Sequence, residues 1–138
     1  MSNEYTALGL MSGTSGDGID ASIIRSDGQE KYSLILDKYF EYNTDIYKNI
    51  HNLKEKINNK SDLKKLSKEI IDLEKKITLF HAKIIKDLPY PNVDMVGFHG
   101  QTIYHNAKEK ITSQIGNGEL LSQLTQKNII YNFRENDL

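Results

Sequence analysis

Residues 9–20 read Gly-Leu-Met-Ser-Gly-Thr-Ser-Gly-Asp-Gly-Ile-Asp, and this stretch decides the fold. Its centre, residues 12–18, consists of glycine, hydroxyl-bearing and acidic residues, a composition typical of a tight turn. Apolar runs lie on both sides of the turn, at residues 5–11 and 19–26. Because short apolar runs bounded by glycine favour strands, the pattern predicts two strands joined by a glycine-rich loop.

A third strand is expected at residues 31–41. The pair Asp27-Gly28 precedes it and is a frequent hairpin sequence, because both residue types tolerate the backbone angles of a tight turn. The chain should therefore open with three antiparallel strands. Alternation along the third strand predicts four buried positions, which are Tyr32, Leu34, Leu36 and Tyr39.

Two amphipathic helices are predicted after these strands. Apolar residues spaced three and four apart indicate a helix near residues 46–57 and a longer one over 63–88. Ser61 is the expected N-cap of the longer helix, which should end near Leu88 because two prolines follow closely. A coiled coil is the alternative for this helix, but its apolar stripe spans fewer than four heptads. Extra apolar residues widen the stripe and favour packing against a sheet; they are Ile71, Leu79 and Ile85.

The rest of the chain alternates between strand and helix. We expect a buried strand at 93–98, a polar surface loop at 104–111, a short strand at 112–115, a helix at 118–126 and a last strand at 128–133. A hairpin-led sheet followed by helix–strand alternation implies a mixed α/β layered fold. Neither an internal repeat nor a linker divides residues 1–138, so we expect a single domain.

The composition limits the classes of partner. Lys and Arg number 18, Asp and Glu number 19, and the formal net charge of -1 favours neither nucleic acid nor an anionic membrane. Cysteine is absent, which excludes disulfides and thiolate metal sites. No apolar run is long enough to cross a bilayer, and the first residues lack the pattern of a signal peptide. We therefore expect a cytoplasmic chain that binds neither nucleic acid nor membrane.

The glycine-rich turn carries the strongest functional signal. Its glycines let the backbone approach a ligand closely, and successive amides in a tight loop form an anion-binding concavity. An acidic residue here, Asp17 or Asp20, suits a magnesium ion, its waters or a sugar hydroxyl better than it suits a phosphate. The alternative is a glycine-rich hairpin without a ligand, and the Walker pattern of P-loop proteins is absent.

Three ordered motifs resemble one family. Residues 11–20, MSGTSGDGID, are similar to the N-terminal signature of the anhydro-N-acetylmuramic acid kinases. Residues 97–105, GFHGQTIYH, resemble the family segment G-x-H-G-Q-T-x-x-H. Residues 113–117, SQIGN, and 132–134, NFR, resemble its Q-I-G-D and D-F-R segments. The resemblance runs from about residue 8 to the last residue, with three departures: Gly16 replaces a larger apolar residue, and Asn117 and Asn132 replace aspartate.

The resemblance implies both a fold and a site. The family belongs to the actin, hexokinase and heat-shock-70 ATPase superfamily, which implies a ribonuclease H-like, actin-like ATPase N-terminal domain whose first hairpin binds ATP phosphates. On this chain the implied phosphate-binding residues are Gly13, Thr14, Ser15, Gly16, Asp17, Gly18, Ile19 and Asp20. Asp17 is also the implied contact to Mg²⁺, through the bound nucleotide.

The implied reaction uses ATP, Mg²⁺ and water to open the 1,6-anhydro ring of anhydro-N-acetylmuramic acid and phosphorylate O6. Its product is N-acetylmuramic acid 6-phosphate, an intermediate of peptidoglycan recycling. The family's catalytic aspartate and second domain lie beyond Leu138, because its members are more than twice this length. We therefore expect a truncated, inactive part of a kinase that is a homodimer at full length. The alternative is a split or relic phosphate- or sugar-binding module that needs a separate C-terminal chain.

Residues after the strand at 93–98 are candidates for binding the sugar. Ligands of α/β proteins bind at the carboxyl ends of strands, which points to three residues, His99, Gln101 and Thr102. Arg134 either contacts phosphate or sugar, or pairs with a neighbouring carboxylate. A structural role is favoured for Asn117 and for the remaining histidines, which are His51, His81 and His105.

Overall fold

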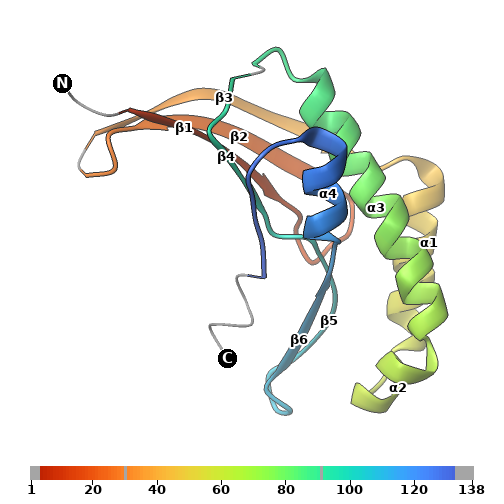
Figure 1. The fold of residues 1–138 in the computed structure, drawn as a ribbon. Helices are drawn as coiled ribbons and strands as arrows, with labels where there is room; N and C mark the ends of the chain where they lie inside the picture. Colours follow the sequence, from red (N-terminus) through yellow and green to blue (C-terminus); the bar gives the residue numbers. More distant parts are fainter. Residues whose placement is uncertain (1–3, 30, 91, 133–138) are drawn as a thin grey trace.

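A five-stranded mixed sheet with helices against one face forms the centre of the structure (Figure 1). The computed structural model describes residues 4–29, 31–90 and 92–132. The sheet has the order β3-β2-β1-β4-β7 and consists of β1 (Tyr5–Met11), β2 (Gly18–Ser26), β3 (Tyr32–Glu41), β4 (Met95–Phe98) and β7 (Ile129–Ile130). A separate two-stranded sheet consists of β5 (Gln101–Asn106) and β6 (Ile111–Ile115). The helices are α1 (Thr44–Lys56), α2 (Lys60–Lys65), α3 (Ser67–Asp87) and α4 (Gly118–Thr125).

The predicted antiparallel opening and the mixed α/β class are confirmed. β1 pairs antiparallel with β2 and β2 with β3, whereas β1 pairs parallel with β4. Leu8 and Leu10 of β1 are buried on the helix-covered face, and so are their cross-strand partners, which are Ala21, Ile23, Val96 and Phe98. This register places the end of β4 beside the loop that leads from β1 into β2.

Burial along β3 differs from the prediction. Tyr32, Leu34 and Tyr39 are 77%, 59% and 48% exposed, so three of the four predicted buried positions are wrong, and Leu36 is half-buried. Tyr39 pairs with Asp20 on the face of the sheet opposite the buried Ile19, and a register shift opposite Leu36 and Leu34 interrupts the alternation. β3 is also an edge strand in the described sheet, which leaves its side chains less covered.

The first two helices begin at asparagine caps. Asn43 accepts a hydrogen bond from the Ile46 amide and starts α1, in agreement with the predicted helix. The predicted Ser61 cap is wrong, because Asn59 caps α2 in a reciprocal capping box with Asp62. The helix predicted over 63–88 is interrupted at residue 66. Its first residues belong to α2, and the rest forms α3, which ends at residue 87, close to the predicted end.

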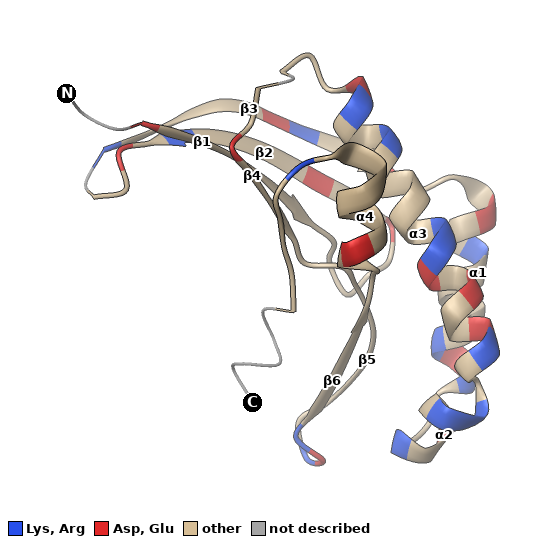
Figure 2. Ribbon diagram, viewed as in Figure 1, with Lys and Arg blue, Asp and Glu red and all other residues tan. Residues whose placement is uncertain are grey.

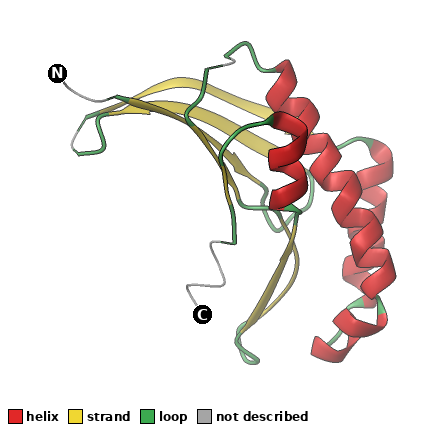
Figure 3. Cartoon of the chain, in the orientation of Figure 1, coloured by secondary structure: helices red, strands yellow, loops and turns green. Residues whose placement is uncertain are grey.

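The long helix α3 packs against the sheet rather than forming a coiled coil, as predicted. All helices lie on one side of the strands in Figure 3, and the His81 ring contacts the Phe98 ring of β4 at 4.8 Å. The apolar stripe is narrower than predicted, because Ile71 and Leu79 are 63% and 44% exposed, whereas Ile85 is buried. Helix α3 also packs against α1 on one side and α4 on the other, in addition to the sheet.

The C-terminal third contains a hairpin that the sequence pattern did not reveal. The predicted surface loop at 104–111 is wrong at its ends, because residues 104–106 belong to β5 and residue 111 begins β6. The strand at 93–98 is shorter than predicted, and α4 and β6 are confirmed. Of the predicted strand at 128–133, only β7 is formed among the described residues, and residues 133–138 lie outside them.

Charged side chains gather mainly on α1, α2 and α3 (Figure 2). Two ion pairs join helical segments there, Lys56 with Glu69 at 3.1 Å and Lys76 with Asp45 at 2.9 Å. Exposed pairs of this kind contribute about 0–1 kcal/mol each, so apolar packing is the main force that holds α1 against α3. Among the described residues, no helix is both long and apolar enough to cross a membrane.

His81 makes the stability of this fold depend on pH. The side chain is fully buried, and its Nδ1 hydrogen-bonds the Ile77 carbonyl at 2.7 Å. Nε2 is buried and has no hydrogen-bond partner in the described part of the chain. Burial lowers the pKa of His81 from its ordinary 6.5 to about 4, partly opposed by the bond to Ile77. The unfolded chain therefore binds a proton more readily than the folded one between these two values.

We expect the free energy of unfolding to fall by about 3 kcal/mol between pH 7 and pH 4 through His81 alone. This contribution is complete above pH 6.5 and is lost as pH falls toward 4, because protonation would place a charge in the core. Denaturant titrations of the unsubstituted chain and His81→Leu at both pH values isolate it. His105→Leu, a change at an exposed histidine, is the matched control, and equal pH profiles for all three proteins would contradict the prediction.

Candidate functional site

The glycine-rich loop lies between β1 and β2, at the edge of the sheet where β4 ends. The Gly16 amide donates to the Gly13 carbonyl at 3.2 Å and closes a turn with Thr14 and Ser15 exposed at its tip. Gly16 has φ +71, a left-handed conformation that L side chains rarely adopt. The loop therefore exposes the hydroxyls of Thr14 and Ser15 at the tip of a glycine-rich turn, a composition that suits an anion.

Gln101 holds this loop in place through buried hydrogen bonds. Its side chain is fully buried, and Nε2 donates to the carbonyls of Gly13 at 2.9 Å and Thr102 at 3.0 Å. Oε1 accepts a hydrogen bond from the Tyr42 hydroxyl at 3.1 Å. The Tyr42 hydroxyl has a single proton, which it donates in the hydrogen bond to Gln101. In the 3.1 Å contact between the hydroxyls of Ser12 and Tyr42, the Ser12 hydroxyl is therefore the donor. We call Ser12, Tyr42 and Gln101 the loop clamp.

Tyr42 is the centre of the loop clamp. Its amide donates to the Asp17 carbonyl at 3.0 Å, so backbone and side chain bind opposite ends of the same loop. Its ring packs against Phe80 of α3 with centroids 5.4 Å apart. Burial raises the pKa of Tyr42 to about 12, although the hydrogen bond with Ser12 opposes the shift. The hydroxyl consequently remains a neutral donor at any physiological pH.

Helix α1 borders the other side of the loop. Lys54 donates a hydrogen bond from its ammonium to the Thr14 carbonyl. A Cβ added at Gly16 would lie 2.8 Å from Ile50 Cγ2 and 3.5 Å from His51 Nε2. This Nε2 is buried and has no hydrogen-bond partner among the described residues. The helix thus fills the space where a larger residue at position 16 would project.

Carboxylates lie near the exposed side of the loop. Asp17 borders an open hollow of about 430 Å³ with Tyr39, Glu41, Tyr42, Thr44 and Tyr47. Desolvation raises the pKa of Tyr39, and the negative charges of Asp17, Glu41 and Asp20 add to this shift. In the part of the chain that the structure describes, no three His, Cys, Asp or Glu side chains converge to hold a metal ion. Asp17 could therefore serve Mg²⁺ only together with ligands such as phosphate oxygens and water.

The sequence-predicted sugar candidates lie behind the loop. The His99 amide donates to the Leu10 carbonyl at 3.2 Å, so His99 directly adjoins the start of the loop. Thr102 is buried, and its hydroxyl accepts from Gln114 at 3.1 Å. Gln101 and Thr102 belong to β5 and not to the expected loop after β4. Arg134 lies outside the described residues.

Asn117 has the structural role that the sequence favoured. Its side chain accepts from the Leu120 amide at 3.0 Å and caps α4. Its amide donates to the Thr78 hydroxyl, and the adjacent Gly116 amide donates to Glu74, each at 3.0 Å. These bonds attach the start of α4 to α3 and do not involve the glycine-rich loop.

The sequence analysis did not identify Tyr42 or Lys54 as site residues. It also did not predict that His51 lies beside the glycine-rich loop. No local pattern marks Tyr42, because its side-chain partners are 30 and 59 residues away. Lys54 is one of many lysines on the helices, and only the fold shows that it meets residue 14.

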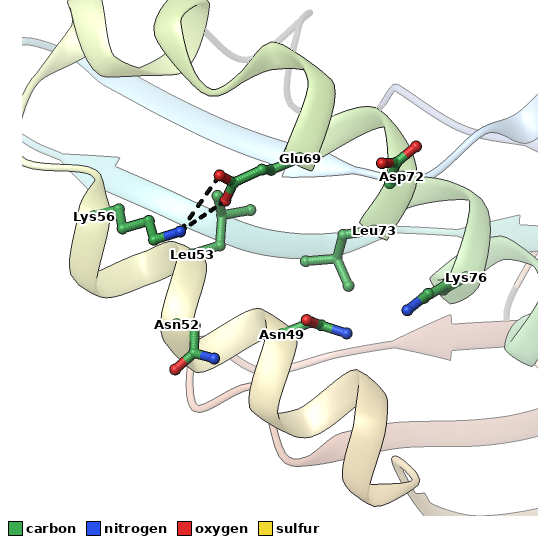
Figure 4. A pocket seen from close by; sticks show the side chains of 8 residues that line it. All are labelled: Asn49, Asn52, Leu53, Lys56, Glu69, Asp72, Leu73 and Lys76. Carbon is green, nitrogen blue, oxygen red and sulfur yellow. Dashed lines mark hydrogen bonds and ion pairs between the residues drawn. The ribbon is translucent and has the colours of Figure 1, made fainter.

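A second hollow lies between α1 and α3, away from the loop (Figure 4). Its lining residues are Asn49, Asn52, Leu53, Lys56, Glu69, Asp72, Leu73 and Lys76. Figure 4 shows Lys56 reaching across it to Glu69, and Lys76 pairs with Asp45 outside it. The charges of Lys56 and Lys76 are balanced by Glu69 and Asp72 in the lining, so this groove offers a phosphate no net positive charge.

Comparison with known proteins identifies the family. A family model described as "Anhydro-N-acetylmuramic acid kinase" matches residues 5–138. A protein of that name from Pelagibacter ubique (strain HTCC1062) is 62% identical over 141 residues, which cover 100% of this chain and 38% of the relative. Namesakes from Agrobacterium fabrum and Rhizobium etli are 33% and 34% identical, with 100% and 96% of this chain covered and 39% and 38% of the relatives. This chain thus spans less than two fifths of their length, and it belongs to the anhydro-N-acetylmuramic acid kinase family.

Proposed function

We propose that this chain supplies the ATP phosphate-binding part of an ATP-dependent kinase of anhydro-N-acetylmuramic acid. The observation that carries the proposal is the loop clamp, because three buried hydrogen-bonding side chains hold a solvent-facing glycine-rich turn in one conformation. Each such bond contributes about 1 kcal/mol to stability, and a loop without a ligand gains little from being fixed so firmly. Preorganised amides bind phosphate oxygens without a further ordering cost.

Within this proposal, residues 13–16 bind the phosphates of ATP through the hydroxyls of Thr14 and Ser15 and through backbone amides other than that of Gly16, which donates to the Gly13 carbonyl. The remaining members of the site, Asp17, Gly18, Ile19 and Asp20, form the end of the loop and the start of β2. Asp17 would help to hold the waters of a Mg²⁺ ion, and that ion would supply the positive charge that phosphoryl transfer requires. The fold that goes with this site is the ribonuclease H-like, actin-like ATPase domain, in which residues 1–138 form an incomplete N-terminal domain.

The sugar lies on the side of the loop next to β4 in this proposal. His99 adjoins the start of the loop, the Thr102 and Gly13 carbonyls share the Gln101 amide donor, and Arg134 follows β7, the neighbour of β4. Gln101 acts through the loop and not on the sugar, since both of its amide protons are given to backbone carbonyls. The reaction would open the 1,6-anhydro ring with water and phosphorylate O6 to give N-acetylmuramic acid 6-phosphate, a step of peptidoglycan recycling in the cytoplasm.

The test is a chimera in which these 138 residues replace the matching segment of the Pelagibacter ubique relative. We expect the chimera to form the sugar phosphate from anhydro-N-acetylmuramic acid in an ATP-dependent reaction, and mass spectrometry detects this product. Absence of both the sugar phosphate and phosphate release, from a folded chimera, would reject the kinase assignment. The second candidate function is a binding module that works with a separate C-terminal chain. In that case we expect this chain to bind phosphate or sugar, and we expect a separate reading frame downstream to encode the partner chain.

Substitutions in the loop should lower the activity of the chimera more than one at a distant surface. Asp17→Asn removes the carboxylate offered to the metal, and we expect a loss of about 10²-fold or more in kcat/KM. Gly13→Val should act similarly, because a Cβ there would lie 3.6 Å from the Ser15 hydroxyl oxygen and 4.0 Å from the Ser15 amide nitrogen, so the valine methyls would crowd these donors. Lys60→Ala, at the start of α2, should retain activity. Steady-state kinetics with equal losses in all three variants would place the nucleotide elsewhere.

A further inference from the structure

We infer that Lys54 supplies a positive charge to the phosphate groups bound by the glycine-rich loop, an inference that rests on the proposed function. The ammonium of Lys54 already donates to the Thr14 carbonyl at the tip of the loop. An ammonium has three N–H donors, and this contact uses one of them. Two donors therefore remain beside the exposed hydroxyls of Thr14 and Ser15, where the phosphate oxygens bind.

Packing of α1 against the loop sets the position of Lys54. Ile50 and His51 lie behind Gly16, and Lys54 follows them on the same face of the helix, three to four residues further along. The His51 ring also packs against the Tyr47 ring, with centroids 4.2 Å apart and the planes tilted by 45°. Because this helix face is fixed to the loop, the lysine does not have to be ordered when a ligand binds, which removes part of the usual entropic cost.

Charge balance at the loop favours the same assignment. Asp17 and Asp20 are exposed carboxylates close to where a polyphosphate would bind, so they oppose its approach. The bond to the Thr14 carbonyl holds the Lys54 ammonium at the loop, so its charge acts there at short range. Its neighbours differ, since Lys48 is exposed and Lys56 is paired with Glu69. Lys54 is thus the α1 lysine placed to offset the loop carboxylates.

Binding measurements on the chimera test this role with Mg·ATP, pyrophosphate and adenosine as probes. We expect Lys54→Met to weaken binding of ATP and pyrophosphate by about 10- to 100-fold, which is the usual effect of losing a charge-assisted hydrogen bond. Adenosine carries no phosphate, so its affinity should not change. Lys54→Gln keeps a donor for the Thr14 carbonyl but has no charge, and it should show the same loss. Lys54→Arg restores the charge and should recover most of the affinity.

Lys48→Met on the same helix is the matched control and should bind all three probes like the unsubstituted chimera. Normal ATP affinity in Lys54→Gln would overturn the inference, because it would mean that residue 54 only holds the Thr14 carbonyl. Equal weakening for adenosine and ATP would also overturn it, since that result indicates general damage to the site. If the unsubstituted, folded chimera does not bind ATP at all, the proposed function fails and this inference fails with it.

Discussion

The 138-residue chain by itself should transfer no measurable phosphate from ATP to anhydro-N-acetylmuramic acid. Its family resemblance implies a catalytic aspartate and a second domain beyond residue 138, and the chain spans 38% of its Pelagibacter ubique relative. Loss of a catalytic base commonly lowers a rate by about 10²–10⁴-fold. Loss of the second side of the cleft also removes substrate positioning, which contributes roughly 7–11 kcal/mol when fully developed. Either loss is enough to bring turnover below detection.

A coupled ATPase assay and mass spectrometry of the sugar, on pure chain, provide the measurement. The chimera with the remainder of the Pelagibacter ubique relative is the positive control, because it contains the same loop together with the part of the relative that this chain does not match. Robust turnover by the chain alone would mean that its catalytic base lies within residues 1–138. Asp17 and Asp20 would then be the first carboxylates to substitute.

Gly18→Ala should destabilise the fold by about 3 kcal/mol, the upper range for overpacking a close contact. A Cβ at Gly18 would overlap the Phe40 carbonyl oxygen of β3 and lie 2.6 Å from the Tyr39 hydroxyl. The tyrosine can move aside, but the carbonyl belongs to the backbone of the paired strand and cannot move without breaking the β2–β3 register. Denaturant titration at pH 7 measures the change in the free energy of unfolding.

Gly9→Ala is the matched control for this substitution. Gly9 also lies within the sheet, but a Cβ there would be 3.9 Å from its nearest neighbour, the Ser22 carbonyl oxygen. Alanine lowers the entropy of the unfolded chain, so Gly9→Ala should change stability by less than about 1 kcal/mol, in the stabilising direction. Similar midpoints for the two variants would show that β3 is not held closely against Gly18.

Features that depend on neighbouring residues were predictable from the sequence. The turn at 12–18 and its flanking strands follow from glycine spacing and apolar runs, and α1 follows from its apolar periodicity. The end of α3 follows from the prolines after it. The family motifs pointed to the same loop, so the candidate phosphate-binding residues could be named before any contact was known.

Features that depend on distant partners could not be predicted in this way. Tyr32, Leu34 and Tyr39 have the alternation of a buried strand, yet their exposure depends on which face of the sheet the helices cover. Gln101 has the chemistry of a sugar ligand, but its partners are a carbonyl 88 residues away and a tyrosine 59 residues away. β5 has too few apolar residues for the pattern to distinguish it from a loop, so its pairing with the predicted strand β6 was not foreseen.

The loop clamp also determines when the phosphate site can form as the chain is made. Ser12 and Tyr42 leave the ribosome long before Gln101, which must reach the Gly13 carbonyl across 88 residues of sequence. Contacts at such separation form late, because the entropy of closing the intervening chain must be offset first. The first hairpin can therefore pair early in synthesis, while its turn stays unfastened until β4 and β5 have docked. We expect nucleotide binding by nascent chains to begin only after residue 101 has emerged and folded.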